Sequence, residues 1–393
     1  MRRNDVAPKL RHLLAPVQGR PHIAAMLPPP VPRALPSGAF SAPLANEAER
    51  ALGRLQGLTE HWPAYDLLTR TLARREAVQS SQIEGTKTNL GQLLAYEATH
   101  SAQGLPADVR VTEQYVHALQ LGLDAIRANG RRALNLELIG KLHALLMQHE
   151  AVEPKGSFRT EIAWIGAGRI EDASFVPSPP AAINAGMREL ETEMLQYRSR
   201  EDEIGALSLV AQVAIAHAQF ETIHPFTDGN GRVGRLLMPL MLAAGGHPPL
   251  YLSGSLMRHR AGYYAALNRV QLQGDWRPWL DMLSRAIFES AGEAVQLAQD
   301  LDALVAQWDI VLRDYRRDSV ARRLPPLLIG HPVVTASHVA ALLDVSHRSA
   351  LTGIQNLIRE NILVEADTRG RGRTCLAHAV LARLNKPPTN NPS

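Results

Sequence analysis

The sequence has a single cysteine, Cys375, among its 393 residues. An internal disulfide is therefore impossible, and this thiol count favours a reducing compartment. The N-terminus has basic residues but lacks the apolar segment and small-residue cleavage site of a secretory signal. The most apolar stretch, residues 205–220, is too short to span a bilayer and leads into a polar loop. We therefore expect a cytoplasmic protein in which this stretch is a buried helix.

The chain also has little net charge, +4 overall. It is unevenly placed, because residues 311–393 contain twelve Lys or Arg and six Asp or Glu, which leaves a balance of −2 for the rest of the chain. The composition, 45% apolar and 20% charged, is typical of a globular protein, and the length suffices for two or three domains. From residue 45 onwards the apolar spacing is mostly helical, which predicts a mainly α fold.

Residues 224–235, with the sequence HPFTDGNGRVGR, bring several reactive side-chain types together. The glycines allow a tight turn whose amides can converge on an anion. Arg232 and Arg235 lie one helical turn apart, and arginine suits forked contacts with phosphate oxygens. Asp228 is a hard oxygen ligand of the kind that Mg²⁺ takes beside phosphates. His224 can accept a proton near neutral pH, which suits a base that activates a hydroxyl. This pattern predicts a phosphate site.

The same stretch resembles the signature of the Fic (Fido) family at every defining position. The resemblance implies a protein adenylyltransferase that moves AMP from ATP to a hydroxyl of a target protein. It makes His224 the catalytic base and Asp228 the Mg²⁺ ligand. It also implies an ATP-phosphate site, comprising Gly229, Asn230, Gly231, Arg232 and Arg235, in which Arg235 holds the γ-phosphate. The alternative is a Gly-Asn turn that caps a buried helix, which would leave two arginines and an aspartate unexplained.

A second motif lies upstream, at Ser80, Glu84 and Gly85. Ser80 and Glu84 are four residues apart, so they share one helix face, and Gly85 is placed to end the helix. The residues alone indicate an ordinary helix end. However, the segment resembles the inhibitory motif of autoinhibited Fic proteins, which implies that Glu84 pairs with Arg235. The carboxylate would then occupy the γ-phosphate position and exclude ATP or hold it unproductively.

Residues 156–168 and 175–180 predict a short hairpin, because β-branched and aromatic residues alternate with Gly and end at prolines. A surface hairpin is the ordinary interpretation. The segment also resembles the Fic flap, which implies that a target protein pairs its main chain with residues of about 160–175.

The run from Arg260 to Trp279 resembles the closing helices of the family, where aromatic residues border the nucleotide. Tyr263, Tyr264 and Asn268 are therefore candidate adenine contacts, although such aromatics are more often core residues. His217 precedes His224 by seven residues, but this spacing matches no common zinc pattern, so we expect His217 to pack within its helix.

We predict four segments. Residues 1–40 form a Pro-rich arm that should run extended, either packed on its own domain or loose. Residues 41–130 form the helical region with the inhibitory helix, and residues 131–311 form the Fic core. Residues 312–385 resemble a winged helix-turn-helix domain.

In this last segment, a helix at about 347–360 should turn four residues inward: Leu351, Ile354, Leu357 and Ile358. Arg369, Arg371 and Arg373 would lie on the wing. Such a module binds DNA, mediates dimerisation or docks a target, and its fold does not decide among these.

Two functions from different classes follow. One is an autoinhibited AMP transferase, with ATP as substrate and Mg²⁺ as cofactor. The other is a DNA-binding regulator whose Fic core only senses nucleotide. The intact His224 favours the enzyme, because sensing needs no base. An enzyme that also removes AMP, or that uses another nucleotide donor, is a further alternative.

Overall fold

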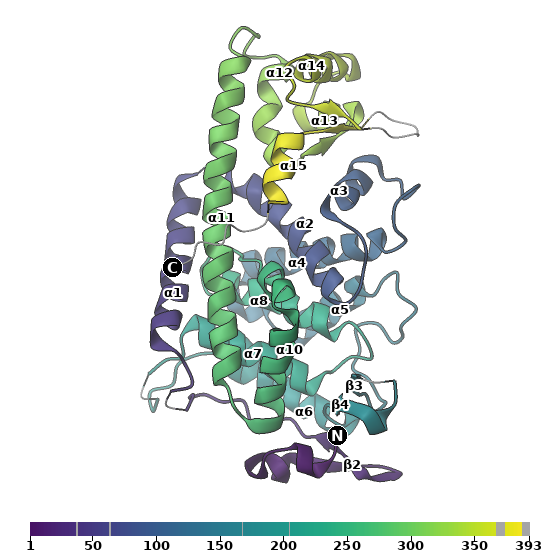
Figure 1. Ribbon diagram of the computed structural model, residues 1–393, viewed down its shortest axis with the longest axis vertical. Helices are drawn as coiled ribbons and strands as arrows, with labels where there is room; N and C mark the ends of the chain where they lie inside the picture. The colour runs from purple at the N-terminus through teal and green to yellow at the C-terminus, as the bar shows by residue number, and fades with distance from the viewer. Residues whose placement is uncertain (37, 63, 167, 204, 367–373, 387–393) are drawn as a thin grey trace. The chain divides into compact units, whose positions relative to one another are not determined.

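The computed structural model describes residues 1–393 except 37, 63, 167, 204, 367–373 and 387–393. The chain divides into two compact units. Figure 1 shows its helices and strands, coloured by residue number. Unit 1 comprises residues 1–53, 79–84 and 114–290, and unit 2 comprises residues 54–78, 85–113 and 291–393. The four predicted segments stay a prediction.

The elements of the first half of the chain are mainly helical, as predicted. They are β1 (Leu14–Val17), β2 (Arg20–Met26), α1 (Ala42–His61), α2 (Tyr65–Ile83), α3 (Leu90–Thr99), α4 (Val109–Asn129), α5 (Leu136–Leu146), β3 (Ile165–Gly166), β4 (Ala173–Phe175) and α6 (Pro180–Leu190). The predicted hairpin is confirmed, since β3 and β4 pair antiparallel with Ile165 opposite Phe175, whereas its role as a flap stays a prediction.

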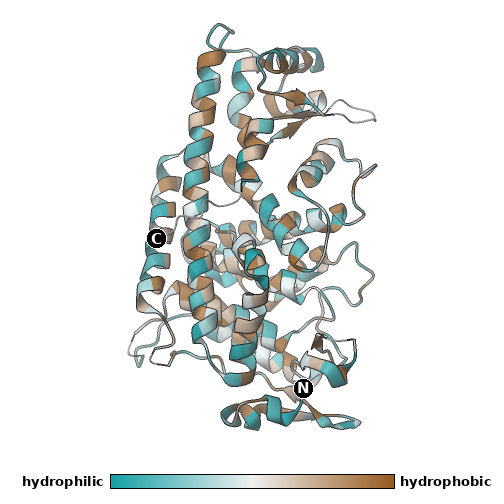
Figure 2. Ribbon diagram, viewed as in Figure 1, coloured by the Kyte–Doolittle hydropathy of each residue, from teal (hydrophilic) through white to brown (hydrophobic). Residues whose placement is uncertain are grey.

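The second half continues with α7 (Leu209–Ile223), α8 (Asn230–Ala244), α9 (Ser253–Arg258), α10 (Arg260–Asn268) and α11 (Arg277–Val311). The last elements are α12 (Val320–Arg323), β5 (Val333–Val334), α13 (Ala336–Leu343), α14 (His347–Arg359), β6 (Val364–Glu365), β7 (Cys375–Leu376) and α15 (His378–Leu384). Figure 2 shows hydrophilic and hydrophobic bands alternating along α11, as expected of a helix with one buried face. No helix of the described residues is both long and apolar enough to cross a membrane.

The N-terminal arm is more ordered than its prolines predict. Strands β1 and β2 form an antiparallel hairpin, with Leu14 opposite Met26. Its buried residues, including Ile23 and Met26, share one apolar cluster with Phe175 and Val176 beside the flap. The Met26 amide donates to the Val176 carbonyl at 2.9 Å. The arm therefore packs against the segment that carries the flap.

The predicted buried helix is α7, the central helix of unit 1. Ser208 caps its start by accepting the Ala211 amide at 3.2 Å, and every residue from Val210 to Ile223 is buried. A helix surrounded on all sides can be apolar all round, which explains the long apolar run in the sequence. Helix α8 packs beside α7 after a six-residue loop, residues 224–229. This loop carries the candidate site.

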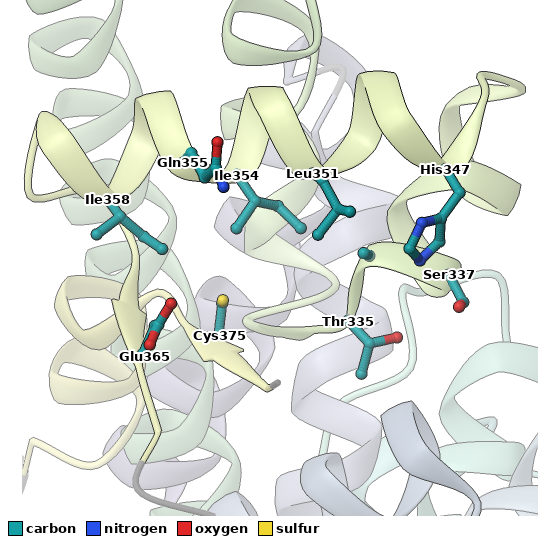
Figure 3. A pocket seen from close by; sticks show the side chains of 10 residues that line it. Thr335, Ser337, His347, Leu351, Ile354, Gln355, Ile358, Glu365 and Cys375 are labelled. Atoms are coloured by element: carbon teal, nitrogen blue, oxygen red, sulfur yellow. The ribbon is translucent and has the colours of Figure 1, made fainter. Parts of the chain in front are cut away.

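In unit 2, α13 and α14 lie in the chain between β5 and the pair of β6 and β7, and the three strands form an antiparallel sheet in the order β5-β7-β6. The winged-helix assignment itself stays a prediction, and Arg369, Arg371 and Arg373 lie outside the described residues. One expectation for α14 is wrong. Ile354 and Leu357 are buried, but Leu351 is 40% exposed. Its side chain faces a hollow of about 220 Å³ between α14 and the strands, and none of the described residues fills it (Figure 3).

Candidate functional site

The site begins at His224, which ends α7 with a left-handed backbone, φ +51°. This conformation is uncommon for a residue with a side chain, so the surroundings must hold it. The His224 amide donates to the Phe220 carbonyl at 2.8 Å, and the Arg159 Nε donates to the His224 carbonyl at 2.9 Å. These two bonds fix the backbone of His224 and so orient its imidazole. The side chain of His224 is 19% exposed.

Arg159 is a buried cation that bonds only main-chain carbonyls in the described structure. Its guanidinium donates to Glu161 O at 2.7 Å and Ser178 O at 2.5 Å, besides His224 O. Burial lowers the pKa of Arg159 to about 10. The main chain of Arg159 also donates to Pro225 O at 2.9 Å. Arg159 therefore ties the start of the flap segment to the turn at His224.

The loop after His224 is closed by Asn230. Its Oδ1 accepts the Phe226 amide at 2.9 Å, and its Nδ2 donates to the Phe226 carbonyl at 2.8 Å. The Asn230 side chain thus shapes the loop. The first helical bond of α8 runs from the Val233 amide to the Gly229 carbonyl. The three preceding amides, those of residues 230–232, lie at the positive end of the α8 dipole and have no partner within the helix, an arrangement that suits an anion. The predicted phosphate site at residues 229–231 stays a prediction, and the Gly229 amide donates to Asp228 Oδ1.

His143, on α5, packs against this loop and bonds to its main chain. Its ring stacks on Phe226 with centroids 3.8 Å apart. Its Nδ1 accepts the Gly156 amide at 2.8 Å, so Nε2 carries the proton and donates to the Asp228 carbonyl at 3.1 Å. Burial lowers the pKa of His143, which favours this neutral tautomer. The loop conformation is therefore held from two sides, by Asn230 and by His143.

Asp228 presents an exposed carboxylate at the entrance of α8. Its Oδ1 accepts the Gly229 amide at 2.6 Å, which leaves the other oxygen for a ligand. The described residues contain no group of three or more His, Cys, Asp or Glu side chains suited to a metal. A single carboxylate fits Mg²⁺ of the kind that completes its shell with water and nucleotide phosphates.

The two arginines of α8 point to different partners. Arg232 is 5% exposed and donates to Glu150 Oε1 at 3.2 Å, while its buried Nε has no hydrogen-bond partner among the described residues. Arg235 is 1% exposed and donates to Ser80 Oγ at 2.9 Å and Glu84 Oε1 at 2.6 Å. Both guanidinium groups are thus fixed, and the Arg235 pairing is the one that the sequence resemblance implied.

Glu84 also lies directly over the start of α8. A Cβ placed on Gly231 would overlap the Glu84 carboxylate and come within 3.0 Å of Arg235 Nη1. The absence of a side chain at residue 231 therefore makes room for Glu84 at the helix N-terminus. Glu84 raises the pKa of Arg235 above its ordinary value, although burial opposes this. The predicted helix end is confirmed as well, since α2 ends at Ile83 and Gly85 has φ +102°.

Family comparisons agree with this geometry. Residues 42–124 match the family described as Fic/DOC family N-terminal, and residues 133–242 match the family described as Fic/DOC family. The chain contains a Fic domain.

Relatives of this Fic domain include protein adenylyltransferase fic-1 of Caenorhabditis briggsae, 30% identical over 208 residues, which are 52% of this chain and 37% of that protein. Protein adenylyltransferase Fic of Nematostella vectensis is 27% identical over 209 residues, 52% of this chain and 45% of that protein. The chain thus spans less than half the length of these curated relatives.

Solved structures show the same fold. A Fic family protein from Desulfovibrio desulfuricans G20 superposes with a TM-score of 0.54 at 20% identity, covering 88% of this chain and 98% of that one. Fic-1 from Caenorhabditis elegans gives a TM-score of 0.50 at 22% identity, covering 66% and 74%. The fold prediction, a mainly helical Fic fold, is confirmed.

The candidate adenine contacts of the Fic domain differ in their surroundings. Tyr263 is buried, its hydroxyl lies 2.8 Å from His217 Nε2, and its ring contacts the ring of Trp279. Tyr264 is 37% exposed and Asn268 is half-buried, so these two keep polar atoms near the surface. His217 packs within the helix, as predicted.

Sequence reasoning missed three residues of this site: His143, Arg159 and Glu221. Arg159 and His143 bond to main-chain groups, which every residue has, so the sequence does not identify these partners. The one available signal was for His143, because it is a histidine on the apolar face of α5. Glu221 is a buried carboxylate whose Oε2 lies 3.7 Å from His224 Nδ1.

Proposed function

We propose that the chain is an autoinhibited protein adenylyltransferase. It would transfer AMP from ATP to a Ser, Thr or Tyr hydroxyl of a target protein and release pyrophosphate. The observation that carries the proposal is the pair of the buried Arg235 with Glu84 at the start of α8, directly after the loop that begins at His224. The names of the curated relatives support the same reaction.

The chemistry follows from the positions of the side chains. The α8 amides, Arg232 and Arg235 bind the triphosphate and stabilise charge that develops during transfer. His224 takes the proton of the target hydroxyl, whose oxygen forms a bond to the α-phosphorus while the bond to the pyrophosphate breaks. A Mg²⁺ held by Asp228 would neutralise phosphate charge when bound.

The flap supplies the docking surface for the target in this proposal. The two-stranded sheet of β3 and β4 leaves main-chain groups on its outer edges. An extended target segment can add to such an edge through main-chain hydrogen bonds. Because these bonds read no side chain, target specificity through the flap alone would be weak.

Inhibition follows from competition for Arg235. The γ-phosphate needs the guanidinium that Glu84 now holds, and the Glu84 carboxylate adds negative charge beside the amides of α8. ATP must therefore displace Glu84 or bind without its γ-phosphate contact. ATP bound without the γ-phosphate contact would have its α-phosphorus misplaced for attack by the target hydroxyl.

The test of the reaction uses ATP labelled at the α-phosphate. Purified Glu84→Gly should incorporate one AMP per modified hydroxyl, seen by mass spectrometry, with an equal amount of pyrophosphate released. Glu84→Gly/His224→Ala should bind ATP but incorporate none. Label in the second variant would contradict the role of His224. Intact ATP binding without label in either variant would instead favour the nucleotide-sensing regulator.

A second proposal concerns residues 312–385. The order of α13, α14 and the antiparallel sheet supports a winged helix, which suggests contact with DNA, a second copy or a target protein. Exposed cations on α14, Arg348 and Arg359, favour DNA among these. Duplex DNA of mixed sequence should shift in a gel with this chain and lose affinity steeply with salt. Absence of binding at low salt would contradict it.

A further inference from the structure

Glu221 lies on α7 one turn before His224 and one turn after His217. It is 8% exposed. Its Oε2 lies 3.7 Å from His224 Nδ1, and its Oε1 is buried with no hydrogen-bond partner among the described residues. The Nδ1 atoms of His217 and His224 are also buried and unpartnered in that part of the chain. A buried carboxylate thus lies between two imidazoles on one helix.

Gly234 makes this arrangement possible. A Cβ at residue 234 would lie 2.7 Å from Glu221 Oε1 and 3.3 Å from His217 Nδ1. Neither the carboxylate nor the imidazole could keep its position beside a larger residue. The bare backbone of α8 at Gly234 therefore provides the space in which Glu221 lies.

Four titratable groups face Glu221: His217 and His224 on α7, Arg235 on α8 and Tyr263 on α10. Burial favours the neutral acid, but the contact with His224 and the charge of Arg235 oppose it, and the pKa of Glu221 is lowered. Burial also lowers the pKa of His217 to about 4. At neutral pH, His217 is therefore uncharged and Glu221 is ionised, facing the base.

We propose that Glu221 is the positioning residue for His224, an inference that rests on the proposed transferase. The carboxylate already favours the Nδ1–H tautomer of His224 across the 3.7 Å contact of the free chain, and this contact tightens to a hydrogen bond in the substrate complex. This bond fixes the tautomer whose bare Nε2 takes the proton of the target hydroxyl, and the negative charge stabilises the imidazolium that results. Glu221 itself stays ionised throughout, and the proton remains on His224 until it passes to solvent.

The first test needs no activity. In the ¹⁵N-histidine spectrum of the full chain, His224 should be the Nδ1–H tautomer. Glu221→Met, which removes the acceptor, should convert it to a mixture of tautomers. The matched control is Tyr263→Phe, which breaks the bond to His217 but keeps the Glu221 carboxylate, so His224 should keep its Nδ1–H tautomer. An Nε2–H tautomer in the wild type would overturn the proposal even if Glu221→Met failed to fold.

The second test measures rate in the activated background. Glu84→Gly/Glu221→Gln should lower kcat by at least tenfold, within the roughly 10²–10⁴-fold that a general base contributes, with KM for ATP changed less than about twofold. The acidic limb of the pH–rate profile of this double variant should lie at a different pH from that of Glu84→Gly. Unchanged kcat and profile would overturn the proposal. If no variant transfers AMP, the transferase fails, but the tautomer test still decides the link between Glu221 and His224.

Discussion

The Glu84 carboxylate lies 2.6 Å from the guanidinium of Arg235, although 151 residues separate them in the chain. Arg235 is almost wholly buried, whereas the Glu84 side chain is 38% exposed. Glu84 can therefore leave into solvent, but Arg235 cannot follow. Because the main-chain carbonyl of Ser80 also accepts from Arg235, at 3.1 Å, the guanidinium keeps a partner when Glu84 departs, and it stays in place for a phosphate.

Ser80→Ala tests whether Ser80 holds Arg235 toward Glu84. Loss of the 2.9 Å bond to Arg235 Nε should weaken the inhibitory contact. We expect label transfer from ATP to rise by roughly two- to tenfold, an effect of up to about 1.4 kcal/mol, and to remain below that of Glu84→Gly. A rate equal to wild type would show that Ser80 has no part in the inhibition.

Arg159→Lys tests the support of the turn at His224. A lysine keeps the charge but cannot reach several carbonyls at once, so buried acceptors lose their donor. The free energy of unfolding in urea should fall by about 2–4 kcal/mol. The control is Arg20→Lys, in the exposed pair of Arg20 with Glu171. This variant should change the free energy of unfolding by less than about 0.5 kcal/mol. Equal stability of the two variants would argue against the role of Arg159.

His217 should make stability depend on pH. Burial lowers its pKa to about 4 in the folded state, against an ordinary 6.5, so the unfolded chain binds more protons between these values. Stability should therefore be full above about pH 6.5 and fall by up to about 3 kcal/mol as the pH drops toward 4. His217→Gln should flatten this part of the urea-denaturation profile. Parallel profiles for the two proteins would assign the loss to other groups.

The sequence predicted the parts of the site that are close together in the chain. The loop of residues 224–235 and the end of α2 follow from glycines and charged residues at fixed spacing. The pair of Glu84 and Arg235 came only from the family resemblance, because no local spacing relates α2 to α8. Residues such as Arg159 could not be predicted, since their partners are carbonyl groups that any sequence offers.

In the fold, too, features set by nearby residues were predicted and features set by distant partners were not. The buried helix α7 was predicted from its apolar stretch, because a helix that is covered on all sides has no polar face. The β1–β2 hairpin was missed, since its apolar partners lie near Phe175, far along the chain. The prediction for Leu351 was wrong because periodicity tells which face is apolar, not whether a neighbour fills the space beside it.

The most direct test of the account compares initial rates of α-label transfer for wild type, Glu84→Gly and Glu84→Gly/Arg235→Ala, with the chain itself as acceptor. If Glu84 blocks ATP by holding Arg235, Glu84→Gly should be at least about tenfold faster than wild type, and the added Arg235→Ala should abolish the gain. Equal rates for wild type and Glu84→Gly, with ATP bound by both, would contradict the account.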